Sequence, residues 1–486
     1  MNYSLVIHIL GYVLVTEGGL FLLPMTAAVI YGERAWYVWL LFALATALIG
    51  FLMTRVKMKN GRLVQRDGNI AVALSWLVMS FIGALPFVVL GDIPNYLDAL
   101  FETVSGFTTT GASILPAVEG LNHSSLFWRS LTHWVGGMGV FILIMSFLPL
   151  TGSSTIHLMR AESPGYSVDR MVPRLRDTAK KLYTIYLIIT AAEIVCLILS
   201  GMKVFDSFCL TFGTVGTGGF GVRNDSLASY TPLQQYIVTL FMILSGVNYA
   251  AYFALAAKRP KDALKNQEVR MYLLIFAATS AVITANLMGL FAPDGARHTG
   301  FFEALRHAMF QTGSIMTTTG FTTADYDLWP GLSKSLLLAL MIIGACAGST
   351  GGGFKISRLM IVLKEIKREI LLIFHPNSVQ NVRMEGHQLS RDTIRTMNVF
   401  TLAYCVIFAV SVILISVDNF DMTTNITAVA ATFNNIGPGL AAVGPVRNYA
   451  AYSGFSKVIL IFDMLCGRLE LFPMLTILVP AAWKKR

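Results

Sequence analysis

The chain has 486 residues, of which 55% are hydrophobic and only 13% are charged. Soluble globular proteins carry about 25% charged residues, and the mean hydropathy of +0.63 lies far above a soluble value. Disordered, fibrous and disulfide-rich classes are therefore excluded. The composition predicts an all-α polytopic membrane protein.

The chain is basic, with 37 Lys and Arg residues against 27 acidic ones and a net charge of +10. In a soluble protein this excess would suggest nucleic acid, but in a membrane protein it indicates basic cytoplasmic loops, so no nucleic-acid partner is expected. The five cysteines show no metal-binding spacing and are interpreted as small apolar residues. They are Cys196, Cys209, Cys346, Cys405 and Cys466.

Ten stretches are long and apolar enough to span a bilayer, which takes ~20 residues. They are, in chain order, 5–30, 36–54, 70–90, 126–150, 183–202, 234–256, 271–292, 333–353, 397–416 and 454–481. The first has no basic region before it and carries Glu17 at its middle. We therefore expect a retained helix at this end and not a cleaved signal peptide.

An even number of spans places both termini on one side of the membrane. The four loops on that side, together with the C-terminal tail, contain 27 of the 37 basic residues. The loops are 55–66, 160–181, 258–270 and 355–395. Because basic loops stay in the cytoplasm, both termini are predicted to be cytoplasmic.

A Thr/Gly-rich tract recurs four times after the first two spans. Each copy follows an apolar span and a shorter apolar stretch, and precedes another span. The tracts are 107–111, 212–216, 316–320 and 433–437, and their final glycines are 105, 104 and 117 residues apart. This spacing indicates internal repeats. It predicts a two-helix extension at 1–67 and four pore repeats at 68–160, 161–262, 263–375 and 376–486.

The stretches before the tracts are too short to cross a bilayer and are expected to be re-entrant half-helices. They are 97–107, 203–212, 301–316 and 421–433. Non-helical backbone at membrane depth must line a cavity or be buried in protein. Helix C-termini and rings of backbone carbonyls attract and dehydrate monovalent cations. One tract alone could be a helix-packing patch of small residues, but four at similar spacing favour a filter around a central pore.

Two further features are expected inside the membrane. Three consecutive glycines at 351–353 should break the helix predicted at 333–353, and Lys355 follows them. This is not a nucleotide-binding loop, because the order Gly-Lys-Ser/Thr is absent; it is either a packing kink or a movable loop.

Arg468 lies in the last span near Asp463 and Glu470. It forms an ion pair with one of them or projects into the pore.

These motifs resemble the superfamily of potassium transporters with four linked helix–pore–helix units. Within it, the chain resembles the bacterial Trk potassium-uptake subunits of the TrkH family along essentially its whole length. The matching motifs are Thr-Thr-Gly-Ala at 109–112, Thr-Val-Gly-Thr-Gly-Gly-Phe at 214–220, Thr-Thr-Thr-Gly-Phe at 317–321, Asn-Asn-Ile-Gly-Pro-Gly at 434–439 and Gly-Arg-Leu-Glu at 467–470.

The resemblance implies potassium uptake across a bacterial inner membrane through a selectivity filter that binds potassium ions. The implied filter residues are Thr109, Thr110, Gly111, Thr214, Val215, Gly216, Thr318, Thr319, Gly320, Asn435, Ile436 and Gly437. The implied gating residues are Gly351, Gly352, Gly353, Lys355 and Arg468. It also implies a homodimer in lipid and a TrkA-like cytosolic regulatory subunit. NAD or ATP/ADP would bind that subunit, and no organic cofactor is expected in this chain.

Two other classes of function share some of these sequence features. A sodium- or proton-coupled secondary transporter also uses broken helices and repeats, but the parallel two-span repeats favour a central pore. An intramembrane enzyme would need catalytic pairs that the sequence lacks, so no enzymatic activity is expected. Four acidic residues could attract cations to the entrance or stabilise half-helix N-termini. They are Asp98, Glu102, Glu303 and Asp421.

Overall fold

The structure, a computed structural model, describes residues 1–56, 65–139, 175–256, 258–290, 300–378 and 380–484. Some predictions fall outside these residues: most of the basic loop at 160–181, the second half of the span at 126–150, and part of the loop at 55–66. Within the described residues, the chain is almost entirely helical, with one short antiparallel pair of strands, β1 (Arg383–Met384) and β2 (His387–Gln388). The all-α fold class is therefore confirmed.

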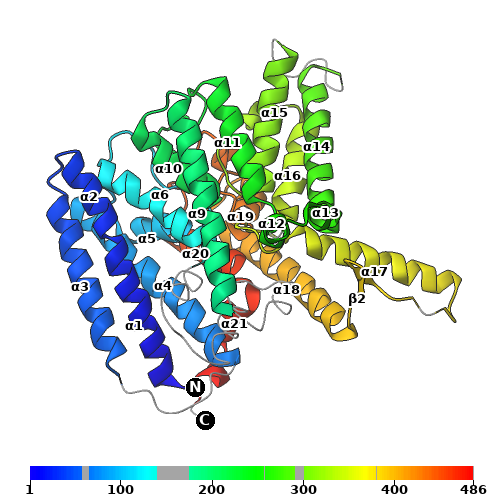
Figure 1. Cartoon of the computed structure of the whole chain (residues 1–486), viewed down its shortest axis with the longest axis horizontal. Coiled ribbons are helices and arrows are strands. Elements are labelled where there is room, and N and C mark those ends of the chain that lie inside the picture. The colour runs from blue at the N-terminus through cyan, green and yellow to red at the C-terminus, as the bar shows by residue number, and fades with distance from the viewer. Residues whose placement is uncertain (57–64, 140–174, 257, 291–299, 379, 485–486) are drawn as a thin grey trace.

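The N-terminal extension lies at one edge of the molecule and has two closely packed spans, the first made of two consecutive helices (Figure 1). It contains α1 (Tyr3–Leu20), α2 (Leu22–Ile30) and α3 (Trp36–Thr54). A Cβ atom at Gly11 would lie 2.8 Å from the carbonyl oxygen of Gly50, and one at Gly18 would lie 2.8 Å from that of Ala43. Small residues thus let the two backbones approach, which is how helices associate in lipid without a hydrophobic driving force.

Four sets of helices follow, each with a long first helix, a short helix, a Thr/Gly-rich tract and a second helix, which is interrupted in the last three sets. The first has α4 (Gln65–Leu90), α5 (Tyr96–Phe107) and α6 (His123–Met138). The second has α9 (Leu175–Leu199), α10 (Val204–Val215), α11 (Pro232–Ser245) and α12 (Tyr249–Ala256), before α13 (Pro260–Lys265). The third has α14 (Gln267–Leu287), α15 (Phe301–Met316), α16 (Gly331–Ile343) and α17 (Ile356–Phe374). The fourth has α18 (Arg391–Ile415), α19 (Met422–Phe433), α20 (Gly454–Leu469) and α21 (Leu471–Leu478). We call these sets units 1 to 4; the exact boundaries of the repeats stay a prediction.

Ten unbroken spans are not what the described residues show. Six helices are long and apolar enough to cross a membrane, and a seventh span is possible if α11 and α12, which are bent by 93°, count as one. The predicted second span of each unit is where the difference arises. Helices α6, α11, α16 and α20 have 16, 14, 13 and 16 residues, each below the length needed for a bilayer.

Glycine and left-handed backbone explain where two of these helices end. Helix α6 ends before Gly139, at φ 83°, and α16 ends before Gly344, at φ 71°. Glycine adopts this conformation without the steric cost that other residues meet. The helix predicted at 333–353 therefore ends eight residues before Gly351, and residues 344–355 form a loop that we call the intramembrane loop.

The two ends of the chain lie next to each other (Figure 1). The Met1 amino group donates to the Lys484 carbonyl oxygen at 2.8 Å, and the Tyr3 hydroxyl donates to the Trp483 carbonyl. The first and last described residues are therefore in direct contact, while the side of the membrane on which they lie stays a prediction. In Figure 1, helix α17 and the strand pair extend from the body of the molecule on the right, on the side away from α1 and α3.

Candidate ion-conduction site

The four short helices end in the same backbone turn. They end at Phe107, Val215, Met316 and Phe433. In every unit the N–H group two residues beyond the helix donates to the carbonyl of its penultimate residue, at 3.0 to 3.2 Å. The donor residues have left-handed φ values of 54° to 58°; they are Thr109, Thr217, Thr318 and Asn435. Non-glycine residues rarely adopt this conformation, so its occurrence in all four units establishes their structural equivalence.

This equivalence corrects the predicted register of the second tract. Thr214 and Val215 form the last turn of α10, and Gly216 is its C-cap. The Thr214 hydroxyl donates to the Leu210 carbonyl at 2.8 Å inside that helix. The residues that match the other tracts are three positions later, at 217–219. The sequence favoured the earlier register because Phe212 stands four positions before Gly216, as Phe107 does before Gly111, whereas the residue four before Gly219 is the smaller Val215.

The glycines that end the tracts form a closed circle. They are Gly111, Gly219, Gly320 and Gly437, with φ values of 78°, 80°, 86° and 94°. At each one, an added Cβ atom would collide with a carbonyl oxygen of the next unit. The oxygens are those of Gly218 for Gly111, Thr319 for Gly219, Ile436 for Gly320 and Thr110 for Gly437. Unit 4 therefore closes onto unit 1, and any side chain at these positions would push the tracts apart.

The circle lies between two hollows in the structure. One is lined by all four ring glycines together with residues that follow the tracts, including Arg223 and Tyr449. The other is lined by the intramembrane loop and by residues at the ends of the second helices, including Arg468. A ring of backbone with space on both sides has the geometry of a narrow passage. Four helix C-termini point their negative dipole ends at it, which favours a cation.

Threonine hydroxyls in the tracts mainly satisfy local backbone. The hydroxyls of Thr108 and Thr317 donate to the carbonyls of Val104 and Gly313, each at 2.7 Å. These bonds reinforce the helix ends that hold the tracts. Backbone carbonyl oxygens are thus the groups that all four tracts can offer to a monovalent cation.

The intramembrane loop packs directly against the tracts of units 3 and 4. The Gly352 N–H group donates to the Thr318 hydroxyl at 2.7 Å. A Cβ atom at Gly352 would lie 2.8 Å from the Asn434 carbonyl oxygen, and one at Gly351 would lie 2.9 Å from that of Thr317. The glycines at 351–353 therefore let the loop approach the tracts closely, in addition to leaving the helix.

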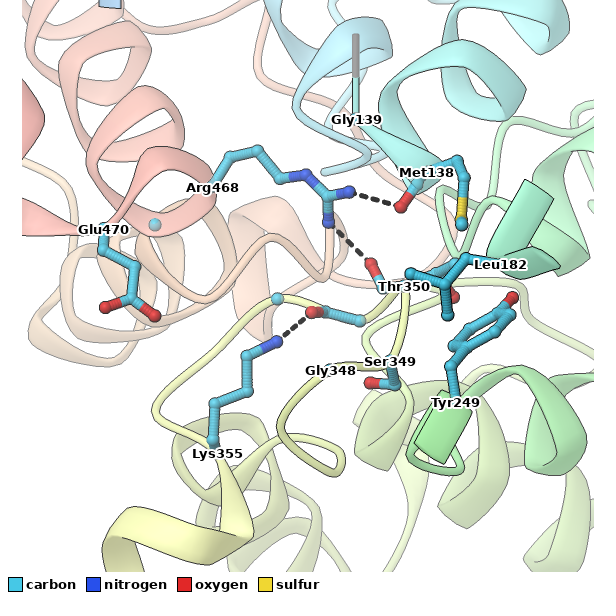
Figure 2. Close-up of a pocket in the computed structure, with 14 residues that line it drawn as sticks. Met138, Gly139, Leu182, Tyr249, Gly348, Ser349, Thr350, Lys355, Arg468 and Glu470 are labelled. Atoms are coloured by element: carbon cyan, nitrogen blue, oxygen red, sulfur yellow. Dashed lines mark hydrogen bonds between the residues drawn. The ribbon is translucent and has the colours of Figure 1, made fainter. Parts of the chain in front are cut away.

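Two cationic side chains hold the loop from the same hollow (Figure 2). Arg468, which extends from α20, donates to the carbonyl oxygens of Thr350 and Gly137, each at 2.6 Å. Lys355 donates to the carbonyl of Gly351. Four of the five residues that the resemblance implied for gating therefore line this hollow, and the fifth, Gly353, lies in the same loop.

The acidic neighbours of Arg468 have other partners. Glu470 pairs with Arg358, and Asp463 accepts a hydrogen bond from Ser411 at 2.7 Å. The described partners of Arg468 are backbone carbonyls instead. These hydrogen bonds to backbone place the guanidinium group in the hollow beside the intramembrane loop.

The outer acidic residues stabilise helix N-termini and ion pairs. Asp421 caps α19 by accepting from the Thr424 N–H group at 3.1 Å, and hydrogen bonds from Thr424 lower the pKa of Asp421. Asp98, in the first turn of α5, pairs with Lys457 at 2.6 Å, and Glu303 lies in the first turn of α15. Of the two interpretations left open by the sequence, the geometry of these residues favours helix stabilisation.

One supporting residue was not predicted. The Tyr449 hydroxyl donates to the carbonyl of Gly437 at 2.7 Å, and the Tyr449 N–H group donates to the Ser113 carbonyl at 2.9 Å. Tyr449 therefore links the outer ends of units 4 and 1. Nothing in the sequence distinguishes it from other aromatic residues, because its role depends on two segments more than 300 residues apart.

Comparison with known proteins agrees with this architecture. The family model "TrkH: Cation transport protein" matches residues 38–485. Among curated proteins, the Trk system potassium uptake protein TrkH of Salmonella typhimurium is 35% identical over 491 residues, and that of Escherichia coli K12 is 35% identical over 494. Both alignments cover 100% of each chain. The TrkG protein of Escherichia coli K12 is 30% identical over 495 residues.

A solved structure is similar along the whole chain as well. The crystal structure of the potassium transporter TrkH from Vibrio parahaemolyticus has a TM-score of 0.89 and 32% sequence identity, and the match covers 100% of both chains. These proteins are transporters and not enzymes. The chain is a member of the TrkH family of cation transport proteins.

Proposed function

We propose that this protein mediates potassium uptake as the membrane subunit of a Trk-type system. The closed ring of four tracts, with a hollow on either side, is the observation that carries the proposal. The relatives named as potassium uptake proteins support the choice of ion. Potassium is the transported ion, and the protein acts as a passage and not as an enzyme.

The proposed selectivity filter is the backbone of the four equivalent tracts. Its residues are Thr109, Thr110, Gly111, Thr217, Gly218, Gly219, Thr318, Thr319, Gly320, Asn435, Ile436 and Gly437. Carbonyl oxygens replace the hydration shell of a monovalent ion, and the number and spacing of the oxygens discriminate between ions. The tracts differ in side chains but share one backbone turn, which is consistent with a filter built from main-chain oxygens.

The proposed gate is the intramembrane loop together with Lys355 and Arg468. The loop packs against two of the four tracts, and both cationic side chains lie in the hollow below them. A positive charge on the conduction path raises an electrostatic barrier to cations. Ions pass when the loop withdraws from Thr318 and releases the carbonyls that Arg468 holds. The present arrangement corresponds to the closed state.

The proposed setting is a bacterial inner membrane, with both termini and the basic loops in the cytoplasm. The membrane potential then drives potassium inward, since it contributes about 2.3 kcal/mol per charge for each 100 mV. We further propose a homodimer and a cytosolic subunit that binds NAD or ATP/ADP. The basic segment 355–395, which includes α17, is the proposed docking site for that subunit.

Ion flux into proteoliposomes tests the function directly. Purified protein is reconstituted, and rubidium uptake is measured in potassium and then in sodium gradients, without any added coupling ion. Protein-free vesicles are the control for leak. Passive flux that favours potassium supports the filter. Flux that appears only with a sodium or proton gradient would instead establish a coupled secondary transporter, and the tracts would then be a binding site.

A further inference from the structure

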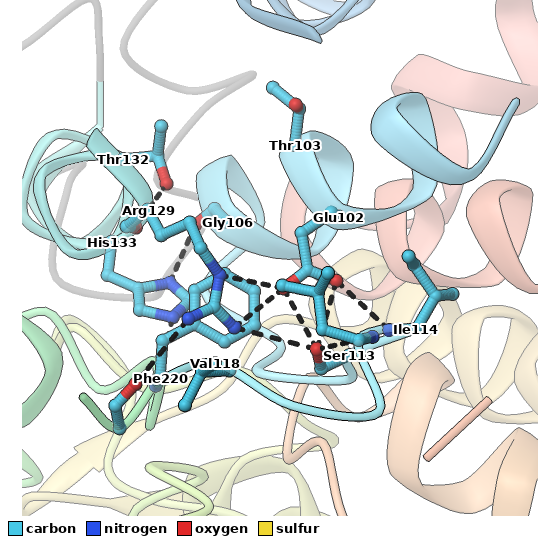
Figure 3. A network of polar contacts seen from close by, with 12 residues as sticks. Glu102, Thr103, Gly106, Ser113, Ile114, Val118, Arg129, Thr132, His133 and Phe220 are labelled. Carbon is cyan, nitrogen blue, oxygen red and sulfur yellow. Dashed lines mark hydrogen bonds and ion pairs between the residues drawn. The ribbon is translucent and has the colours of Figure 1, made fainter. Parts of the chain in front are cut away.

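A buried ion pair lies beside the outer end of the ring (Figure 3). Glu102 stands on α5, nine residues before Gly111, and is 1% exposed. Its Oε1 atom accepts from Nη2 of Arg129 at 2.6 Å and from Nε at 2.9 Å. Arg129, on α6, is 3% exposed. Because the pair is fully buried, it is neither screened by water nor available to attract ions from solution.

The carboxylate of Glu102 also holds the segment that follows Gly111. Its Oε2 atom accepts from the Ile114 N–H group at 3.0 Å, and the Ser113 hydroxyl donates to Oε1 and Oε2 at 3.0 and 3.1 Å. Figure 3 shows the carboxylate between Arg129 on one side and this segment on the other. The outer end of the first tract is therefore attached to its own pore helix by one charged group.

The same network continues into unit 2. The guanidinium group of Arg129 lies 4.1 Å from the ring centroid of Phe220, and its Nη1 atom donates to the Gly221 carbonyl at 3.4 Å. His133 accepts from the Phe220 N–H group through Nε2 at 3.2 Å, and its Nδ1 lies 2.8 Å from the Gly106 carbonyl oxygen. Since Nε2 accepts, the imidazole must be neutral with its proton on Nδ1. The pore helix of unit 1 is thus joined to the residue that follows ring glycine 219.

Unit 4 joins the network through Ser113. The Ser113 carbonyl accepts from Tyr449, whose hydroxyl binds the carbonyl of Gly437. Three of the four outer ends are therefore held by one connected set of hydrogen bonds. Polar networks that are buried and satisfied in this way specify a single arrangement of the groups they join.

No other unit has a charged residue at this position. The residues nine before the ring glycines of units 2, 3 and 4 are Leu210, Gln311 and Ala428. Gln311 makes only a 3.5 Å contact from Nε2 to Thr323 Oγ1, and its Oε1 atom has no hydrogen-bond partner among the described residues. The ion pair is hence a particular feature of unit 1 and not a general part of the pore helices.

We propose that Glu102 and Arg129 are positioning residues that determine potassium-over-sodium discrimination. The proposal rests on the proposed function of the ring as a filter. Discrimination requires the ring to keep the spacing that suits the larger ion and to resist contraction around sodium. The pair fixes the outer ends of units 1 and 2 directly, and that of unit 4 through Ser113. Without it, the ring can adapt to sodium while still conducting potassium.

The test uses Glu102→Gln and Ser113→Ala, measured as the ratio of potassium to sodium flux in proteoliposomes. Glu102→Gln keeps the shape of the side chain and removes the charge. Ser113→Ala removes one link without leaving a buried charge unpaired. We expect the flux ratio to fall about tenfold in Glu102→Gln and by a smaller factor in Ser113→Ala, since directly contacting groups couple by this order of magnitude. Potassium flux itself should persist in both.

A double-mutant cycle and a matched control separate positioning from general damage. Glu102→Gln combined with Arg129→Gln should lose no more selectivity than either single variant, because each already breaks the same link. The control is Glu119→Gln. Glu119 is an exposed residue that also joins units 1 and 2, by accepting from the Asn224 N–H group at 2.7 Å, but it does not contact the ion pair. It should keep the wild-type ratio.

The outcomes distinguish this proposal from the proposed function. Wild-type selectivity in reconstituted Glu102→Gln and Ser113→Ala would overturn the positioning role, as would an equal loss in Glu119→Gln. If Glu102→Gln does not fold, Ser113→Ala decides the question alone. A wild-type protein that shows no passive, potassium-favouring flux would instead refute the filter itself.

Discussion

The Nη1 atom of Arg468 lies 2.6 Å from the carbonyl oxygen of Thr350, so a residue of unit 4 holds the intramembrane loop of unit 3. The same guanidinium group reaches Gly137 in unit 1. Arg468 therefore joins three units beneath the ring. In the gate proposed above, its charge and its hydrogen bonds would both oppose the passage of a cation.

Replacement of Arg468 by alanine is expected to increase cation flux. The change removes a positive charge and the charged hydrogen bonds that hold the loop, each of which contributes about 1.5–3 kcal/mol. An increase of at least about tenfold in rubidium uptake should follow, as 1.4 kcal/mol corresponds to a factor of ten. Arg468→Lys keeps the charge but replaces the planar guanidinium, with its five donors, by a compact ammonium with three, so it should give an intermediate flux. Unchanged flux in the alanine variant would contradict the barrier.

The corrected register of unit 2 makes a direct prediction. Gly219→Ala places a Cβ atom against the Thr319 carbonyl oxygen and should reduce the potassium-to-sodium flux ratio by about tenfold or more. Thr214→Ala removes only a hydroxyl that bonds within α10, and it should leave the ratio unchanged. Both ratios are measured in the same vesicle assay. A lower ratio in Thr214→Ala together with an unchanged ratio in Gly219→Ala would support the register predicted from the sequence.

The bond between Gly352 and Thr318 predicts that the tract helps to keep the loop in place. Thr318→Ala removes the hydroxyl that accepts from the Gly352 N–H group. Because such a hydrogen bond contributes about 1 kcal/mol, its loss should raise basal flux about fivefold. Thr109 is the matched control, since it occupies the equivalent position and its buried hydroxyl has no hydrogen-bond partner among the described residues. Thr109→Ala should therefore leave basal flux near the wild-type value. Equal effects at both positions would indicate a change in the filter and not in the loop.

Gly352→Ala tests the close packing of the loop by adding a methyl group. Its Cβ would lie 2.8 Å from the Asn434 carbonyl oxygen, which is too close for the loop to keep its position. The loop must move away from the tract, so basal rubidium uptake should rise severalfold. Gly331→Ala is the control, because no atom lies within 4 Å of the added Cβ atom. A rise in the control, or reduced uptake in Gly352→Ala, would argue against this view of the loop.

The sequence predicted the fold class and the short helices closely. The stretches expected at 97–107, 301–316 and 421–433 agree with α5, α15 and α19 to within one residue. This success has a physical basis, since apolar length and Thr/Gly content are local properties. The family and the equivalent tracts of units 1, 3 and 4 followed from the same information.

The remaining features depend on spatial relationships that the sequence does not reveal. Helix α10 continues three residues beyond the expected end, because Gly213 lies inside the helix instead of ending it. The second helices of units 2, 3 and 4 read as continuous apolar spans, yet they are interrupted at Gly246, at Gly344 and at the left-handed Glu470. Glu102 could not be assigned one role from sequence, because its partner Arg129 lies 27 residues away on a different helix.

The closed circle of glycines is formed by one polypeptide and not by four identical subunits. A single substitution therefore alters one quarter of the passage and leaves three quarters intact. In an assembly of identical chains, the same change would be repeated four times. Evolution can thus adjust this ring in small increments, and each quarter can specialise separately, as the lone ion pair of unit 1 illustrates.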